Sequence, residues 1–154
     1  MSYQSSHDEF TVEKALLAQK NGLISDWVQA LLHSEGSDKL AKSLAEVKPI
    51  AIEIYDFPLL KLKRIDGPEE KIEHRLSPDI WEAQVSLLTN KIKAGFRPAP
   101  LIVTDYWNYF EIADGNHRHE ALLRNGITSY WTIFLIKNKK GHEYLKESLD
   151  LHEN

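Results

Sequence analysis

The chain has 154 residues, of which 42% are hydrophobic and 27% charged, and these values are typical of one globular domain. Its formal net charge of −4 argues against a dedicated nucleic-acid-binding protein, because such proteins are usually basic. The absence of cysteine excludes disulfides, thiolate metal sites and a cysteine nucleophile. No apolar run is long enough to span a membrane, and the polar first ten residues do not resemble a signal sequence, so we expect a cytoplasmic protein.

The first third of the chain is predicted to be helical. Apolar residues recur there at helical spacing, and Asn21-Gly22, Gly36 and Pro49 interrupt the pattern. Three helices are therefore expected between residues 11 and 47, with candidate N-caps at Thr11, Ser25 and Ser37. We expect their apolar stripes to pack inward, although a partner-binding surface is the alternative; the stripes include Trp27, Leu31, Leu40 and Leu44.

The pattern changes to alternating apolar residues over 50–55, which predicts a strand. A turn-rich connection follows and includes the turn tripeptide at 66–68. Ser77 then precedes a proline and an acidic residue, an arrangement typical of a helix start. That helix is predicted to end at Gly95 with a left-handed cap.

The last third of the chain predicts two strands, a helix, a further strand and a short helical tail. The strands are expected over 101–104 and 109–113, the helix over 117–124, and a centrally buried strand over 127–136. The element order predicts an α+β fold. We expect a helical N-terminal extension over 1–48 that packs on the main domain over 49–140, and a helical tail over 141–154.

One segment concentrates groups that bind anions, namely Asp114-Gly115-Asn116-His117-Arg118. A strand runs through Asp-Gly directly into a helix, and the amides at a helix N-terminus attract negative charge. Gly115 lets a ligand approach the backbone, and Arg118 offers a fork of donors that suits phosphate oxygens. The segment therefore predicts a phosphate site.

Each of these residues also has a purely structural interpretation. Asp114 and Gly115 are also typical of a simple turn with a capping aspartate. Arg118 could form an ion pair with Glu111 or Asp114. His117 and His119 lie two residues apart and so occupy different faces of a helix, which argues against a shared metal ion.

The segment from Asp114 to Ala121, with Pro100-Leu-Ile-Val before it and Leu-Arg-Asn-Gly-Ile after it, resembles the signature of the ParB/sulfiredoxin superfamily. The resemblance covers roughly residues 49–136 and implies a small α+β domain with a mixed sheet, in which the motif turn holds nucleotide phosphates. Sulfiredoxin has a catalytic cysteine where this chain has Asn116, so that chemistry is excluded. ParB has a Gly-Glu-Arg-Arg motif; here Asn116 and His117 replace the first two residues after Gly115, and only Arg118 matches the second arginine. ParB also continues into a helix-turn-helix domain and a dimerisation domain, for which this chain ends too early, so we expect no sequence-specific DNA binding.

The motif is most similar to that of small free-serine kinases of ParB-like fold. That resemblance implies phosphoryl transfer from ATP or ADP with Mg²⁺ to a small molecule. It implies that His117 stabilises the transferred group, that Asp114 holds Mg²⁺, and that Glu69 or Glu70 accepts a proton. Pro68 replaces the histidine that precedes the acidic pair in those kinases, and the pair could equally be a solvated turn.

Two alternatives remain open at this stage. One is a module that binds a nucleotide, a phosphorylated metabolite or a protein partner without turnover. The other is a ParB-like DNA-binding protein or nuclease, for which the basic clusters at 61–64 and 137–140 would have to converge on one patch.

Overall fold

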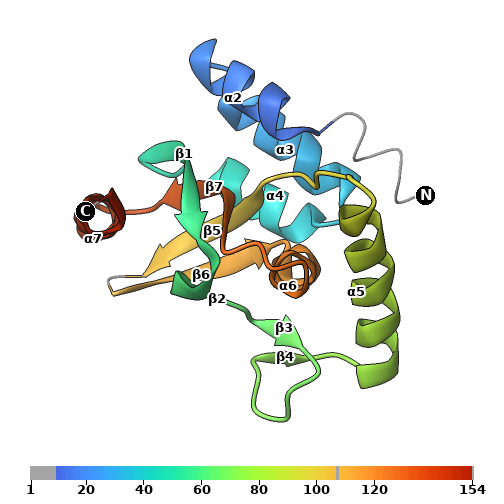
Figure 1. Ribbon diagram of the computed structural model, residues 1–154. Coiled ribbons are helices and arrows are strands. Elements are labelled where there is room, and N and C mark those ends of the chain that lie inside the picture. Colours follow the sequence, from blue (N-terminus) through green and yellow to red (C-terminus); the bar gives the residue numbers. More distant parts are fainter. Residues whose placement is uncertain (1–9, 107, 154) are drawn as a thin grey trace.

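The computed structural model describes residues 10–106 and 108–153 (Figure 1). Residues 1–9, on which the expectation about a signal sequence rests, lie outside the described part of the chain. The fold is α+β, as predicted. A five-stranded mixed sheet, in the order β1-β7-β5-β6-β2, has helices on both faces. No helix within the described ranges is long and apolar enough to cross a membrane.

Three helices precede the sheet, as predicted: α2 (Val12–Lys20), α3 (Ile24–Ser34) and α4 (Asp38–Glu46). The Thr11 hydroxyl caps α2 by accepting a hydrogen bond from the Lys14 amide at 3.1 Å, so that cap is confirmed. The cap predicted at Ser25 is wrong, because α3 begins at Ile24, two residues before the start that a Ser25 cap would give, and Leu23 occupies the N-cap position. Ser37 is at the N-cap position of α4, but its hydroxyl makes no capping bond there.

The sheet contains two parallel and two antiparallel strand pairs, and its strands are β1 (Ala51–Pro58), β2 (Leu62–Lys63), β5 (Leu101–Tyr106), β6 (Tyr109–Asp114) and β7 (Ser129–Ile136). Strand β7 pairs with β1 on one side and β5 on the other, and most of its residues are buried. The predicted central strand is therefore confirmed. Its apolar residues are explained by helices that cover both faces.

The remaining elements are a short 3-10 helix η1 (Leu59–Lys61), the two-residue strands β3 (Asp66–Gly67) and β4 (His74–Arg75), and the helices α5 (Pro78–Lys93), α6 (Asn116–Arg124) and α7 (Lys139–Glu153). Helix α5 begins after Ser77 and is followed by Gly95 at φ 106°, as predicted. The β3–β4 pair was not predicted, because two-residue strands have no periodicity to detect. Helix α7 is longer than the predicted short tail.

Two clusters of buried side chains lie on opposite faces of the sheet. One cluster joins α2, α3 and α4 to the sheet through Ile54, Ile102, Ile133 and Leu135. The other lies beneath α5, α6 and α7, and its largest members include Phe57, Phe110 and Phe134. The expectation of inward packing for the N-terminal helices is met, because Leu31 is fully buried and Trp27, Leu40 and Leu44 pack against the first cluster. This arrangement places the α3–α4 loop near the end of the sheet where β6 leads into α6 (Figure 1).

Candidate functional site

The turn between β6 and α6 depends on Gly115. Its φ of 109° lies in the region that only glycine adopts readily. A Cβ at this position would lie 2.8 Å from Leu101 Cδ2 and 2.9 Å from Arg118 Nη2. Gly115 is the N-cap residue of α6, and no side chain caps that helix. Helix α6 therefore begins at a tightly packed glycine without a side-chain cap, in the order strand, glycine and helix start that the motif predicts.

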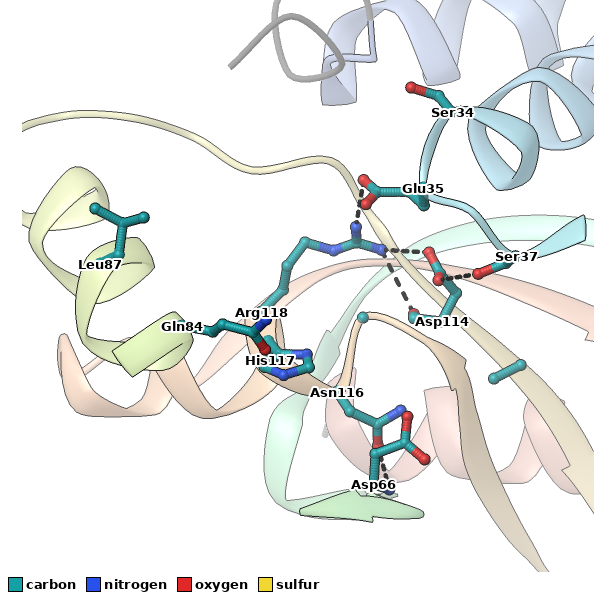
Figure 2. A pocket seen from close by; sticks show the side chains of 12 residues that line it. Ser34, Glu35, Ser37, Asp66, Gln84, Leu87, Asp114, Asn116, His117 and Arg118 are labelled. Carbon is teal, nitrogen blue, oxygen red and sulfur yellow. Dashed lines mark hydrogen bonds and ion pairs between the residues drawn. The ribbon is translucent and has the colours of Figure 1, made fainter. Parts of the chain in front are cut away.

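A cavity of about 550 Å³ lies at this turn (Figure 2). Its wall comes from four parts of the chain: the α3–α4 loop, β3, the middle of α5, and the β6–α6 turn. The residues that line it are Ser34, Glu35, Ser37, Asp66, Gln84, Leu87, Ala113, Asp114, Gly115, Asn116, His117 and Arg118. A cavity of this size holds a small metabolite or a large part of a nucleotide.

Arg118 is only 3% exposed, and its guanidinium lies between two carboxylates (Figure 2). Nη1 donates to Glu35 Oε1 at 3.0 Å, and Nη2 donates to Asp114 Oδ2 at 3.1 Å. Nη2 also donates to the carbonyl oxygen of Pro100 at 3.1 Å. The ion pair with Asp114 that the sequence left open is present. The carboxylate of Glu35 is a partner that the sequence did not reveal.

Both carboxylate oxygens of Asp114 are engaged. Oδ1 accepts a hydrogen bond from the Ser37 hydroxyl at 2.9 Å, and Oδ2 accepts from Arg118. Each oxygen keeps a further lone pair, so the Mg²⁺ role that the family resemblance implies for Asp114, directly or through water, stays a prediction. Within the described ranges, no group of three or more His, Asp and Glu side chains gathers as a metal site.

Asn116 lines the cavity, and its side-chain amide binds the backbone of a distant segment. Its Oδ1 accepts hydrogen bonds from the Ile65 amide at 2.9 Å and the Asp66 amide at 3.2 Å. The buried side-chain amide thus fixes the segment that enters β3 against the start of α6. This is a structural use of a residue that the sequence assigned to phosphate binding.

His117 lies on Trp81 of α5, with the ring centroids 4.5 Å apart. Its Nε2 is buried and has no hydrogen-bond partner within the described part of the chain. Burial lowers the pKa of His117, so the neutral imidazole predominates near pH 7. The neutral ring is therefore part of the cavity wall, with one buried nitrogen left unpaired among the described residues. Its predicted catalytic role stays a prediction.

His119 lies on the buried side of α6, away from the cavity wall. It hydrogen-bonds the Leu59 carbonyl oxygen at 2.7 Å, and because a carbonyl only accepts, Nε2 carries the proton. Burial also lowers the pKa of this histidine. The two histidines therefore have separate surroundings: His117 lines the cavity, and His119 is bonded to the backbone on the buried side of α6.

The acidic pair at 69–70 is not part of the cavity wall. Glu69 binds Arg64 Nη2 at 2.6 Å, which lowers the pKa of Glu69 although partial burial opposes the shift, and both glutamates are exposed. Asp66, three residues earlier, does line the cavity, and its Oδ1 lies 3.0 Å from His74 Nδ1. The geometry therefore favours Asp66 over Glu69 or Glu70 as the carboxylate that could meet a ligand.

Burial controls the electrostatics of Glu35. Desolvation raises its pKa, the neighbouring Asp114 adds to that rise, and Arg118 opposes both. Glu35, Asp66 and Asp114 set three carboxylates against one guanidinium in the cavity wall. Negative charge is in excess there, so an anionic ligand must displace or neutralise part of it.

The sequence analysis missed Glu35, Ser37 and Asp66. Glu35 and Ser37 are separated from their partners by 83 and 77 residues, a distance at which no local pattern applies. The only sequence signal was Glu-Gly-Ser between two helices, which we interpreted as a helix break. Asp66 belonged to a turn tripeptide, and its place at the cavity depends on the two bonds from its segment to Asn116.

One lysine from each basic cluster lies at the tip of the β5–β6 hairpin. Lys63 Nζ lies 5.1 Å from the ring centroid of Tyr109, and Lys137 Nζ lies 4.9 Å from that of Tyr106. The two tyrosine rings stack on each other with their centroids 4.8 Å apart. Arg64, from the first cluster, instead lies over Trp81 and binds Glu69, so the two clusters do not join as a whole.

Comparisons with known proteins give a fold-level likeness. No protein-family model matches the chain, and no curated protein matches it in sequence. Among solved structures, sulfiredoxin from Arabidopsis thaliana is similar at 23% identity and a TM-score of 0.42, over 63% of this chain and 97% of that one. The superfamily that the motif resembles is thus found among the structural neighbours.

Two further structures are similar. A C-terminally truncated chromosome-partitioning protein ParB from Caulobacter crescentus, complexed with CTP-gamma-S, has 16% identity and a TM-score of 0.40 over 65% of this chain. A conserved hypothetical protein from Pyrococcus furiosus has 17% identity and a TM-score of 0.40 over 58% of this chain. The chain spans about half the length of that ParB structure (52%) and about a third (34%) of the other.

Proposed function

We propose that this protein binds a nucleotide or another phosphorylated small molecule in the cavity at the start of α6. The observation that carries the proposal is the uncapped N-terminus of α6, which begins at Gly115 and forms part of a cavity of about 550 Å³. Helix N-terminal amides bind phosphate oxygens well, and glycine lets the phosphate approach them closely. The neutral imidazole of His117 lines the same cavity.

Arg118 supports this proposal by its place rather than by an open guanidinium. Its guanidinium packs against the glycine turn: a Cβ on Gly115 would lie only 2.9 Å from Arg118 Nη2. In the free protein its positive charge is balanced by Glu35 and Asp114. A phosphate would have to share or take over the donor that Glu35 occupies.

Catalysis of phosphoryl transfer is a more specific proposal for the same site. Phosphoryl transfer needs a group that accepts the proton of an attacking hydroxyl. Asp66 supports that role better than the glutamates at 69–70, since it lines the cavity and His74 lies within hydrogen-bond distance of it. A binding module without turnover has the same cavity, so the two forms differ in whether product appears.

The test is thermal unfolding with ATP, ADP, CTP, GTP and inorganic phosphate, each with and without Mg²⁺. A ligand at 100 times its Kd adds about 2.7 kcal/mol to the free energy of unfolding, so the midpoint rises visibly. We expect the rise to disappear in Arg118→Lys, which keeps the charge but loses the fork. Arg124→Lys, at the other end of the same helix, is the matched control.

No rise with any of these ligands would overturn the binding proposal. If a nucleoside triphosphate binds, turnover is tested by incubating the protein with it and a mixture of hydroxyl-bearing metabolites. The release of the nucleoside diphosphate is then measured. Asp66→Asn is expected to abolish product formation, whereas Glu69→Gln with Glu70→Gln is expected to leave it unchanged. The reverse pattern would return the role to the acidic pair.

A further inference from the structure

Among the described residues that line the cavity, Glu35 is the one carboxylate from the N-terminal helical region, in the α3–α4 loop, and its backbone is held in a fixed turn. The Ser37 amide donates to the Leu32 carbonyl oxygen at 2.8 Å, and the Gly36 amide donates to His33 at 3.2 Å. With Gly36 at φ 79°, these bonds form the usual glycine-capped end of a helix. Since the turn is fixed, only the side chain of Glu35 is free to change its position.

The two carboxylates on Arg118 are held unequally. Asp114 accepts from Arg118 with one oxygen and from Ser37 with the other. The carboxylate of Glu35 has one hydrogen-bond partner within the described ranges, Nη1 of Arg118. Loss of that single bond frees Glu35, whereas Asp114 would have to give up two. Glu35 is therefore the group that an incoming ligand would displace.

The position of Glu35 is also the one that a ligand anion would take. Glu35 lines the cavity and meets Arg118 Nη1, while Nη2 is turned toward Asp114 and Pro100 (Figure 2). A phosphate oxygen in place of the Glu35 carboxylate would keep Nη1 hydrogen-bonded. The displaced carboxylate, whose side chain is already 14% exposed, would reach water by rotation alone.

We propose that the Glu35 carboxylate is an internal competitor for Arg118, so that it occupies the phosphate position in the free protein and sets the affinity of the cavity for anions. The proposal rests on the proposed function, because it concerns the same cavity and the same class of ligand. It assigns the N-terminal helices a role in binding: they supply the group that a ligand must displace.

The test compares the binding of ATP and of pyrophosphate to three variants by isothermal titration calorimetry. Glu35→Gln removes the charge and keeps the shape, and Glu35→Ala removes the competing group altogether. We expect both to bind on the order of tenfold more tightly than the unmodified chain. Asp38→Asn is the matched control, because it removes a carboxylate only three residues away, at the first residue of α4, where Asp38 is exposed and binds His33. We expect its affinity to change by less than twofold.

The outcomes separate the two proposals. Equal or weaker binding by Glu35→Gln and Glu35→Ala, with measurable binding by the unmodified chain, would overturn the competitor role and leave the binding site intact. Tighter binding by Asp38→Asn as well would mean that general charge and not the contact with Arg118 is responsible, which also overturns it. No binding by any of the proteins would overturn both proposals.

Discussion

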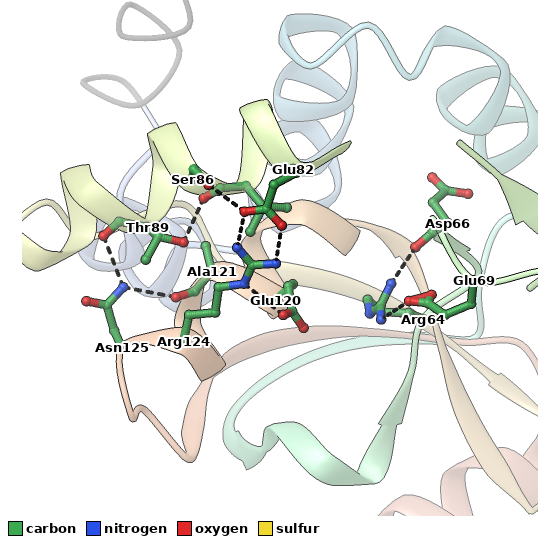
Figure 3. Close-up of polar contacts among 11 residues, drawn as sticks. Arg64, Asp66, Glu69, Glu82, Ser86, Thr89, Glu120, Ala121, Arg124 and Asn125 are labelled. Atoms are coloured by element: carbon green, nitrogen blue, oxygen red, sulfur yellow. Dashed lines mark hydrogen bonds and ion pairs between the residues drawn. The ribbon is translucent and has the colours of Figure 1, made fainter. Parts of the chain in front are cut away.

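Helix α6 has an arginine between two carboxylates near each of its ends, and the two arrangements differ mainly in their contact with solvent. Near the C-terminal end, Arg124 donates to both oxygens of Glu82 at 2.6 and 2.9 Å and to Glu120 at 2.9 Å (Figure 3). The Arg124 side chain is 32% exposed and that of Glu82 is 56% exposed. At the N-terminal end, Arg118 makes similar bonds but is 3% exposed.

The same geometry therefore shifts the pKa values of the carboxylates in opposite directions. The hydrogen bonds from Arg124 lower the pKa of Glu82 to about 2, because little desolvation opposes them. Burial raises the pKa of Glu35 in spite of Arg118. The exposed arrangement joins α5 to α6, whereas the buried one keeps excess negative charge beside a cavity. Carboxylates whose pKa is raised by burial beside a cavity, as for Glu35, are typical of functional sites.

The largest expected effect comes from removing each arginine. Arg118→Met leaves two buried carboxylates without their counter-charge, and such losses cost about 3–5 kcal/mol of folding free energy. Arg124→Met removes exposed ion pairs, so we expect a loss within about 1 kcal/mol. Urea denaturation of both variants measures the difference. Equal losses would show that burial of Arg118 does not distinguish the two ends.

The position of this site was predicted better than its composition. The donor-rich turn from Asp114 to Arg118 was recognisable because strand, glycine and helix start are consecutive in the sequence. The core followed from the same kind of local signal, as the alternation in β1 and the buried run in β7 show. These features depend on residues within a few positions of one another.

The contact of Arg118 with Glu35 could not be predicted, because it depends on how distant segments pack. Glu35 reaches Arg118 because α3 and α4 lie on the sheet through residues such as Ile102 and Ile133. Asp66 reaches the cavity because the Asn116 amide binds the backbone of its segment. A single sequence contains no signal for such contacts. Asp114, four residues before Arg118, was by contrast a candidate partner from its spacing, and that ion pair is present.

The two glycines that flank α6 sharpen the comparison with an intermediate effect. Gly115 and Gly126 both have positive φ, 109° and 75°, so alanine at either position costs about 1–2 kcal/mol. Nothing lies within 4 Å of a Cβ on Gly126, whereas a Cβ on Gly115 would overlap Leu101 and Arg118. Overpacking adds about 1–3 kcal/mol, so Gly115→Ala is expected to be the more destabilising.

Thermal or urea denaturation of Gly115→Ala and Gly126→Ala provides the measurement. The larger loss at Gly115 is expected to come with weaker ligand binding, because the Cβ would also displace Arg118 Nη2. If the two variants are equally stable, the turn before α6 can adjust to a side chain at Gly115. The close packing of Leu101 and Arg118 against this glycine then contributes nothing to the free energy of unfolding.

The smallest expected effect is in the pH dependence of stability, and its sign differs between the two ends. The raised pKa of Glu35 means that the unfolded chain loses this proton first as the pH increases above 4.5. Folding stability therefore falls as the pH rises through the pKa of Glu35 in the folded protein, and Glu35→Gln removes that fall. The lowered pKa of Glu82 has the opposite effect. Its contribution is complete above 4.5 and is lost as the pH falls toward about 2, so Glu82→Gln removes that loss.

Difference curves between the unmodified chain and each variant isolate these contributions, since groups common to both proteins cancel. His117 and His119 have lowered pKa values, so they reduce stability as the pH falls below 6.5, and they are present in both proteins of each pair. The Glu35 difference should therefore decrease with rising pH, and the Glu82 difference should increase. Two curves of the same sign would mean that Arg118 outweighs burial at Glu35, and the N-terminal end of α6 would then be a structural ion pair like the C-terminal one.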